Sequence, residues 1–254
     1  MIRRYCCPAS MLQPVRKQTL SDAVFEQLRD RIVHGELEAG SRLPAERELC
    51  ELLQVNRGAL REALKRLEQA RLVRMHHGGA TRILNYRDEA GLDLLPALLV
   101  DPEQPLNIQV AESVLEMRSA LAPEMARLAA IRGGPQAAER LEAIVHDMHE
   151  SRANLDSLHE LAMEFWAEIA RASNNIAYRL VSNTLRESYR QFRSLLTGIL
   201  AREYRDHDSY AAIARAVRHA DSVAAQNRAA ALTRIGESGV ASVLETLRLE
   251  GTAR

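Results

Sequence analysis

The spacing of apolar residues predicts a small helical domain over residues 19–84. An apolar side chain recurs every four positions from residue 20 to residue 32, which is typical of an amphipathic helix, and Gly35 ends that helix. Between residues 44 and 83 there are two shorter helical patterns, then two short apolar runs around a glycine-rich segment. Residues 1–18 show no periodicity, and we expect them to be a disordered lead-in.

The second and third predicted helices differ in what they expose. The second is expected to begin at Pro44, because proline suits the first helical position. Its apolar face is expected to contain three leucines: Leu49, Leu52 and Leu53. Asn56 is placed to cap the third helix by accepting a backbone N–H. The third helix turns leucines inward and basic residues outward at a spacing of three or four: Leu60, Leu64 and Leu67 inward, and Arg57, Arg61 and Lys65 outward.

A short helix, a tight turn and a basic helix form a unit that the major groove of DNA accepts. The apolar runs at residues 72–75 and 81–83 predict a two-stranded wing beside this unit, joined by glycines that can adopt positive φ. The plainer interpretation is a helical hairpin whose charged face is only solvated. The basic face alone does not decide between the two interpretations.

From Ile108 to residue 250 the periodicity is helical and no strand pattern occurs. We expect six or seven helices there, the fourth of them long, over about residues 180–196, and three shorter ones after it. Residues 85–107 are expected to form a linker, because proline-rich breaks interrupt a short apolar stretch. The predicted fold is mostly α, with an N-terminal winged helix-turn-helix followed by an all-helical bundle over residues 108–250.

Composition adds a charge asymmetry to this picture. The 254 residues contain 34 basic and 34 acidic side chains, so the formal net charge is zero. Residues 1–85 hold 15 Lys and Arg against 10 Asp and Glu, a net +5, and the remaining residues hold 19 against 24, a net −5. A basic front half suits a polyanion-binding domain joined to a regulatory one, although a difference of this size also arises by chance.

Cysteine spacing and hydropathy exclude several other classes of protein. Cys6, Cys7 and Cys50 lack metal-binding spacing, and an odd number of cysteines in a helical chain without an export signal favours reduced thiols. No apolar run approaches the roughly 18 residues of a membrane span. We therefore expect a cytoplasmic protein without a membrane partner.

The segment from Pro44 to Leu72 reads PAERELCELLQVNRGALREALKRLEQARL. It fits the pattern PxERELxxxxxVxRxxxREAxxxLxxxxL and so resembles the winged helix-turn-helix of the GntR family of bacterial repressors. Two further segments resemble the FadR branch of that family, and most of all its fatty-acid regulators: the wing HGGATRI and the segment FWAEIARASNN at residues 165–175. The resemblance covers roughly residues 20–250.

This resemblance implies a homodimer that binds a palindromic operator in double-stranded DNA, since one recognition helix covers only a few base pairs. It also implies the residues that contact DNA: Arg47, Arg57 and Arg61 at bases or phosphates, Lys65 at a phosphate, Asn56 and Gly58 at the start of the recognition helix, and His77 and Gly78 in the minor groove.

Many members of the branch bind a divalent metal in the C-terminal domain, through an Asp, a His four residues later and two more His. The matching positions here are Ala162, Trp166, Tyr210 and Leu232, which supply neither a carboxylate nor an imidazole. We therefore expect no metal, and no other cofactor.

Without a metal, the resemblance to the fatty-acid regulators implies an acyl-CoA effector bound between the helices. The implied contacts are Arg118, Trp166, Asn183, Tyr189 and Tyr210. A guanidinium inside a bundle requires an anionic partner, which a CoA phosphate or a ligand carboxylate would supply. Alternatively, Arg118 pairs with a glutamate of the chain, the tyrosines fill the core, and the effector is a small organic acid such as a sugar acid or an amino acid.

No catalytic motif is visible in the sequence. It has no glycine-rich phosphate loop and no Ser or Cys nucleophile beside a base at motif spacing. We therefore expect a regulator and not an enzyme. Two rival classes remain, an enzyme with a helical DNA-binding appendage and a purely structural helical adaptor.

Overall fold

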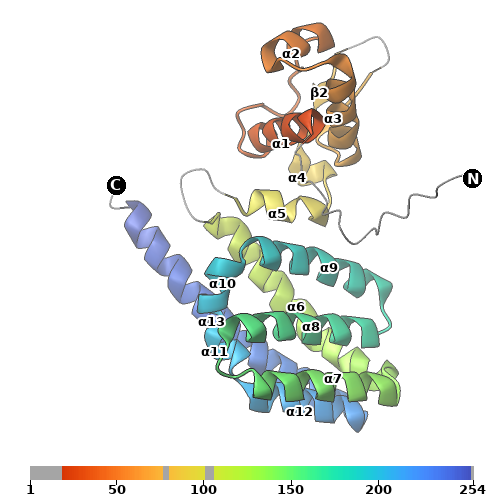
Figure 1. Cartoon of the computed structure of the whole chain (residues 1–254), viewed down its shortest axis with the longest axis vertical. Helices are drawn as coiled ribbons and strands as arrows, with labels where there is room; N and C mark the ends of the chain where they lie inside the picture. Colours follow the sequence, from red (N-terminus) through yellow and green to blue (C-terminus); the bar gives the residue numbers. More distant parts are fainter. Residues whose placement is uncertain (1–18, 77–79, 101–105, 253–254) are drawn as a thin grey trace, which may run out of the picture. The chain divides into compact units, whose positions relative to one another are not determined.

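Figure 1 shows the computed structural model, which describes residues 19–76, 80–100 and 106–252. The chain divides into two compact units, residues 1–91 and residues 92–254. The lead-in expected over residues 1–18 and the wing residues His77 and Gly78 lie outside the described residues.

The first unit contains three helices around an apolar core: α1 (Leu20–Val33), α2 (Glu46–Leu53) and α3 (Arg57–Gln69). α1 begins where the sequence predicts, because Thr19 and Asp22 form a capping box. The Thr19 hydroxyl accepts the backbone N–H of Asp22, and the Asp22 carboxylate accepts the backbone N–H of Thr19. The apolar face of α1 then packs mainly against α3.

α2 begins two residues later than predicted, and one prediction about its leucines is wrong. Pro44 precedes the helix, because the N–H of Leu43 donates to the carbonyl of Thr81 at 2.9 Å and holds this segment extended beside the wing. Leu49 is buried, but Leu52 is 65 % exposed. α2 has only eight residues and packs against α3, so the side of α2 that faces α3 is buried and its other sides remain exposed.

The wing is an antiparallel sheet of two short strands, β1 (Val73–Arg74) and β2 (Arg82–Ile83). Val73 pairs with Ile83, and both side chains are buried, which fixes the sheet to the core of the unit. Arg42 forms an isolated bridge with Arg82, so the segment before α2 lies along β2. A single turn of helix, α4 (Tyr86–Glu89), follows the wing.

The second unit is helical throughout the part of the chain that the structure describes. Its elements are η2 (Leu92–Leu94), α5 (Leu95–Leu98), α6 (Ile108–Arg132), α7 (Gly134–Glu150), α8 (Leu155–Ala172), α9 (Ile176–Gln191), α10 (Arg193–Ile199), α11 (Ala201–Tyr204), α12 (His207–Arg218) and α13 (Ser222–Thr252).

Three predictions about this unit are corrected. Eight helices follow residue 107 among the described residues, where six or seven were expected. The long helix expected over residues 180–196 is broken into α9 and α10 at Phe192, whose φ of −103° and ψ of 21° depart from helical geometry. The last helix, expected to be short, has 31 residues. Apart from these three, the linker expected over residues 85–107 is partly folded, as α4 of the first unit and as η2 and α5 of the second.

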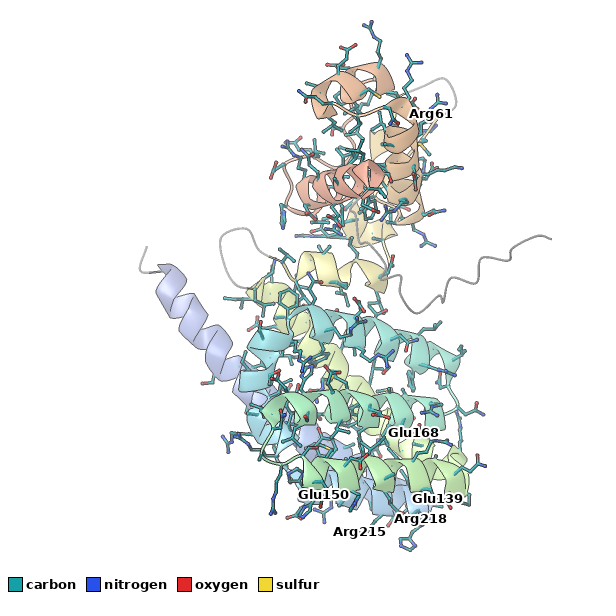
Figure 2. The ribbon with its side chains drawn as sticks, viewed as in Figure 1. Arg61, Glu139, Glu150, Glu168, Arg215 and Arg218 are labelled. Carbon is teal, nitrogen blue, oxygen red and sulfur yellow. The ribbon has the colours of Figure 1, made fainter. Side chains whose placement is uncertain are left out.

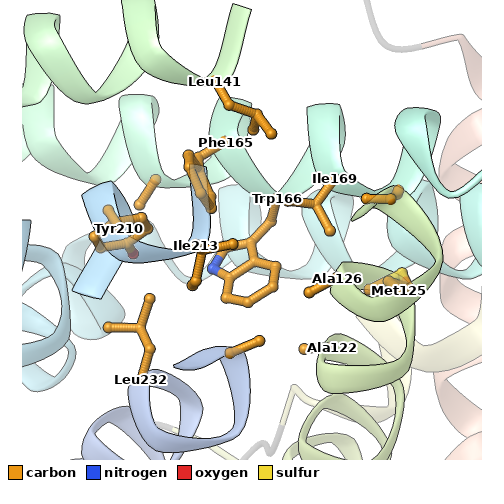
Figure 3. Close-up of a cluster of buried hydrophobic side chains, with 14 of the residues drawn as sticks. Ala122, Met125, Ala126, Leu141, Phe165, Trp166, Ile169, Tyr210, Ile213 and Leu232 are labelled. Atoms are coloured by element: carbon orange, nitrogen blue, oxygen red, sulfur yellow. The ribbon is translucent and has the colours of Figure 1, made fainter. Parts of the chain in front are cut away.

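The bundle has one apolar core. α6 and α13 pack along one another, α12 packs against α7 and α13, and α8 contacts α6, α7 and α9. Figure 3 shows the middle of the core, where Phe165 meets the ring of Tyr210 edge-on with the two centroids 4.9 Å apart. None of the described helices is long and apolar enough to cross a membrane.

Candidate DNA interface and effector site

Two small residues, Asn56 and Gly58, shape the start of α3. The side-chain oxygen of Asn56 accepts the backbone N–H of Ala59 at 2.9 Å and caps the helix, as predicted. A Cβ at position 58 would lie 3.2 Å from that oxygen, so glycine leaves the cap undisturbed. The first turn of α3 is therefore fixed by the cap, and Gly58 adds no side chain beside it.

α3 separates apolar from basic side chains. Three of its leucines have no exposed surface and three of its basic residues are exposed, as predicted: Leu60, Leu64 and Leu67, and Arg57, Arg61 and Lys65. Figure 2 marks Arg61 at the outer surface of the unit. Its Nε donates to the Glu46 carboxylate at 2.9 Å, beside a hollow that α2, α3 and the segment after β1 line through Glu46, Arg61, Glu62, Lys65 and Met75.

Arg66 is a basic residue of α3 that stabilises the fold through contacts with α1. Its guanidinium donates to the Asp22 carboxylate at 2.6 Å and lies over the Phe25 ring, 4.3 Å from the centroid. Hydrogen bonds from Thr19 and Arg66 lower the pKa of Asp22 below its ordinary value. Arg66 thus joins α3 to α1, whereas its neighbour Lys65 is directed to solvent.

The base of the wing is fixed to the end of α3. The Glu68 carboxylate accepts the backbone N–H of Met75 at 2.8 Å, and the N–H of Leu72 donates to the carbonyl of Leu67 at 2.9 Å.

Arg47, on α2, is 81 % exposed at its side chain and lies 4.0 Å from Glu51. The exposed basic residues Arg47, Arg57, Arg61 and Lys65 all lie on helices, α2 or α3.

The helical unit buries an ion pair. Arg118 of α6 donates from Nη2 to the carboxylate of Glu203 on α11, and neither residue is more than 7 % exposed. Gly236 of α13 lies directly against the pair. A Cβ there would come well inside 3.0 Å of Glu203 Oε2 and would lie 3.0 Å from Arg118 Nη1. The chain itself thus supplies the anionic partner that Arg118 requires.

Burial and the pairing act in opposite directions on these two groups. Burial alone would lower the pKa of Arg118, but the charge of Glu203 outweighs it and raises that pKa above the ordinary value. Burial raises the pKa of Glu203, and the Arg118 guanidinium opposes that shift. The direct contact in a region of low dielectric favours the charged pair at neutral pH.

Several polar atoms around the pair lack a hydrogen-bond partner among the described residues. By strict geometry they are Arg118 Nη1, Glu203 Oε2, Trp166 Nε1 and the hydroxyls of Tyr189 and Tyr210. The Trp166 N–H is nevertheless close enough to Glu203 and Tyr210 to oppose the rise in pKa of both. All five side chains are at least nine-tenths buried. Native proteins rarely leave buried polar atoms unpaired, so these atoms are places where an ordered water or a ligand would find hydrogen-bond partners.

Two cavities flank Tyr189, and each measures about 40 Å³ as room for the centres of water molecules. The first is almost wholly apolar: it is lined by Leu99, Leu106, Ala111, Val114, Leu115, Ser188, Tyr189, Phe192, Leu196 and Val240. The second is lined by Arg118, Ala122, Met125, Met163, Trp166, Ser182, Leu185, Arg186 and Tyr189. One water needs roughly 10–15 Å³ on this measure, so each cavity holds a few waters.

Comparison with known proteins identifies both units. The first matches the family described as "Bacterial regulatory proteins, gntR family" over residues 20–83, and the second matches the FCD domain over residues 113–234. The HTH-type transcriptional regulator Mce2R of Mycobacterium tuberculosis is 34% identical over 233 residues, which cover 92% of this chain and 96% of that protein. The chain belongs to the GntR family.

Within that family, the helical unit places this regulator in the FadR branch, which carries the FCD domain. A protein named fatty acid metabolism regulator protein, from Edwardsiella ictaluri, is 32% identical over 175 residues, 69% of this chain and 71% of that protein. A solved structure of Lar, described as controlling the agr system of Listeria monocytogenes, covers 92% of this chain and 98% of its own at a TM-score of 0.50. At 16% identity it shows only the shared fold.

In this GntR regulator the positions expected for metal ligands belong to the core. Figure 3 shows Trp166, Tyr210 and Leu232 among apolar side chains, and Ala162 has no exposed surface. The described residues contain no group of three His, Cys, Asp or Glu that could hold a metal ion. The absence of a metal stays a prediction.

The structure brings together most of the residues expected at the effector. Arg118, Trp166 and Tyr189 line the second cavity. The hydroxyl of Tyr210 is buried in the core of the same helical unit. Asn183 is exposed on α9 and lines neither cavity, because α9 turns its inner face through Leu185 and Tyr189 instead.

Two buried glutamates and one closely packed glycine were missed from the sequence. Glu203 lies on α11, which has only four residues and thus too few for periodicity to mark a buried face. The sequence does contain a signal at Gly236, since a glycine inside a helical pattern often marks a place where a neighbouring element packs closely. Glu168 of α8, labelled in Figure 2, is fully buried and held by Arg140 at 2.8 Å and by Arg171.

Proposed function

We propose that this regulator binds a palindromic operator as a homodimer and releases it when a fatty acyl-CoA binds the helical unit. The observation that carries the DNA-binding part is the division of α3 into a fully buried leucine face and an exposed face with Arg57, Arg61 and Lys65. A capped, rigid helix with this polarity suits the major groove. Two such helices in a dimer would double the length of DNA that is recognised.

The pair of cavities at Tyr189 supports an acyl chain as the effector. Their lining is mostly apolar, and each methylene moved from water into such a site contributes about 0.8 kcal/mol. The relatives named as fatty acid metabolism regulators support the same class of effector. Arg186, exposed at the second cavity, is a candidate contact for a CoA phosphate.

The small size of the cavities suggests how binding would be coupled to DNA release. A long chain would fit only if Tyr189 turned away or α9 moved, which would join the two cavities. An effector shifts a conformational equilibrium only by its preference for one state. A chain that binds only the opened bundle has such a preference, and we propose that the opened state holds the two recognition helices too far apart for the operator.

The second candidate is a small organic acid, which the buried Arg118 favours. Its guanidinium is the group that would bind a carboxylate. The pairing with Glu203 weighs against this candidate, because Arg118 already has an anionic partner.

The test is release of a selected operator from the full chain, followed by fluorescence anisotropy, with acyl-CoAs of increasing chain length. The concentration for half-release should fall as the chain lengthens. Val114→Phe fills the apolar cavity and should disfavour the longest chains, whereas Leu180→Phe, at an exposed position of α9, is the matched control. Release by a sugar acid or an amino acid, with no response to any acyl-CoA, would refute the acyl-CoA effector.

A further inference from the structure

One hydrogen bond orients a basic residue of α3 in the absence of DNA. The Nε–H of Arg61 donates to the Glu46 carboxylate at 2.9 Å and so joins α3 to the first residue of α2. The side chain of Arg61 is still 70 % exposed. The pair borders a hollow that Lys65 and Met75 also line, between α3 and the segment after β1. It therefore lies between the predicted recognition helix and the wing.

The backbone at Glu46 is fixed by its neighbours on both sides. Just before it, the N–H of Leu43 donates to the carbonyl of Thr81 beside the wing at 2.9 Å. The carbonyl of Ala45 accepts the N–H of Leu49 at 2.9 Å, which is the first hydrogen bond of α2. The Glu46 carboxylate thus starts from an anchored position, whereas an arginine on an exposed helix face is otherwise free to sample many rotamers.

The bond at Nε decides which edge of the Arg61 guanidinium is left for DNA. A guanidinium presents two edges that can each bind a pair of acceptors, one formed by Nε with an Nη group and one formed by Nη1 with Nη2. Because Glu46 occupies Nε, the edge of Nη1 and Nη2 remains. That edge matches O6 and N7 of guanine, which accept a bidentate pair in the major groove.

The charge of Glu46 acts on the other possible partner of Arg61. A carboxylate repels the phosphates of DNA, so it disfavours a position of Arg61 against the backbone. An exposed ion pair of this kind contributes little to the stability of a fold. Fixing a flexible side chain before binding, by contrast, reduces the conformational entropy that is lost in the complex. The pair is therefore better explained by recognition than by stability.

Resting on the proposed function, in which Arg61 contacts the operator, we infer that Glu46 is the positioning residue that makes Arg61 select guanine. Glu46 holds Nε, and Arg61 donates from Nη1 and Nη2 to O6 and N7 of one guanine in each half-site. The acid weakens binding to DNA in general and increases the preference for the operator.

The test measures the affinity of the full chain for a selected operator and for an unrelated duplex of equal length, by fluorescence anisotropy at one salt concentration. Glu46→Ala should weaken operator binding about three- to tenfold, because Arg61 loses its fixed orientation. The same change should leave binding to the unrelated duplex equal or tighter, because it removes a negative charge close to phosphates. The ratio of the two affinities should therefore fall.

Glu48→Ala is the matched control. Glu48 is the other acidic residue in the first turn of α2 and is exposed, so both changes remove the same charge from the same helix end. Glu48→Ala should leave the ratio unchanged. Glu46→Gln keeps an oxygen that can accept the Nε–H of Arg61, and it should recover part of the ratio. Circular dichroism checks that each variant folds.

The base is tested on the DNA. Replacing one operator guanine at a time by 7-deazaguanine removes N7 and keeps the base pair. At one position of the half-site this should weaken binding by the unaltered protein at least about threefold. The same replacement should have a smaller effect on Glu46→Ala and almost none on Arg61→Ala, because coupled contacts are not additive.

The outcomes separate this inference from the proposed function. Equal weakening on both duplexes in Glu46→Ala, or an equal fall of the ratio in Glu48→Ala, overturns the inference and leaves operator binding standing. Tighter operator binding by Glu46→Ala would show that Glu46 competes with DNA for Arg61, which also overturns it. If the unaltered chain prefers no duplex over another, the proposed operator binding is refuted, and this inference with it.

Discussion

The two units of the protein place their charged residues in opposite ways. In the DNA-binding unit the charges of α3 lie at the surface, and the core beneath them consists of side chains such as Leu60 and Leu64. In the helical unit Arg118 and Glu203 lie inside the core itself. Exposed charges interact mostly with water until another molecule arrives, whereas buried charges must satisfy one another in the folded chain. Substitution of the exposed charges should therefore affect binding, and substitution of the buried charges should affect stability.

The largest effect is expected from breaking the buried pair. Glu203→Leu leaves the Arg118 guanidinium buried without a counter-charge, and we expect the free energy of unfolding to fall by about 3–5 kcal/mol. Combining Glu203→Leu with Arg118→Met removes both charges and should restore most of that loss. Urea denaturation of the single and double variants measures the coupling. If the double variant were as unstable as the single one, packing and not charge would hold α6 to α11.

A smaller effect, on binding alone, is expected at the surface of α3. Arg57→Ala and Arg61→Ala should each weaken binding to a selected operator by roughly 1–3 kcal/mol if the side chains contact base edges. Lys65→Ala should weaken binding equally on specific and non-specific DNA. The free energy of unfolding should change by less than about 0.5 kcal/mol in all three.

Arg66→Ala is the control for this contrast, because Arg66 lies on the same helix but holds Asp22 and Phe25. It should lower the melting temperature of the DNA-binding unit more than the other three changes do. Undiminished operator binding by the Arg57 or Arg61 variant would show that α3 does not contact bases.

The smallest effect concerns pH and a buried histidine. His159 of α8 has no exposed surface, and its Nδ1 lies 3.1 Å from the Tyr204 hydroxyl. Burial lowers the pKa of His159 below its ordinary value of 6.5, with Arg193 acting in the same direction and Glu160 and Asp156 acting against it. The unfolded chain therefore binds a proton at this histidine more readily than the folded chain does.

The stabilising contribution of the neutral His159 ring is therefore complete above about pH 6.5. It is lost as the pH falls from there toward the lower pKa of the folded state. The free energy of unfolding falls by up to about 1.4 kcal/mol per pH unit in this range. The measurement is thermal melting between pH 7.5 and 5.5. The original chain should lose more stability than His159→Gln over this range. The pKa of His207 is also lowered by burial, and since both proteins retain His207, its effect cancels in the comparison. Parallel pH profiles would count against the histidine.

The sequence predicts the DNA-binding unit well because its features are local. The Asn56 cap, the buried leucines of α3 and its exposed basic residues each follow from residues within a few positions of one another. The start of α2 could not be predicted in this way, since the Leu43 N–H, which holds the preceding segment extended, donates to the carbonyl of Thr81, far along the chain.

The helical unit is harder to predict because its polar groups depend on distant partners. Arg118 and Glu203 are 85 positions apart, and the space for them is left by Gly236 on a third helix. Asn183 was expected at the effector because of a family resemblance, but the backbone of α9 directs it outward. Periodicity identifies which face of a helix is buried, and it does not identify which buried polar residues meet.

The hydrogen bond from Met75 to the Glu68 carboxylate has a consequence for the DNA sequences that this protein can choose. It locks the base of the wing to the last turn of α3, so the two elements cannot slide against each other. In the proposed complex, a duplex that accepts α3 would then have to present its neighbouring groove to the wing at a fixed distance and a fixed rotation along the DNA. Tolerance for unequal operators must come from the spacer between half-sites, and natural variants should differ in spacer length before they differ in half-site geometry.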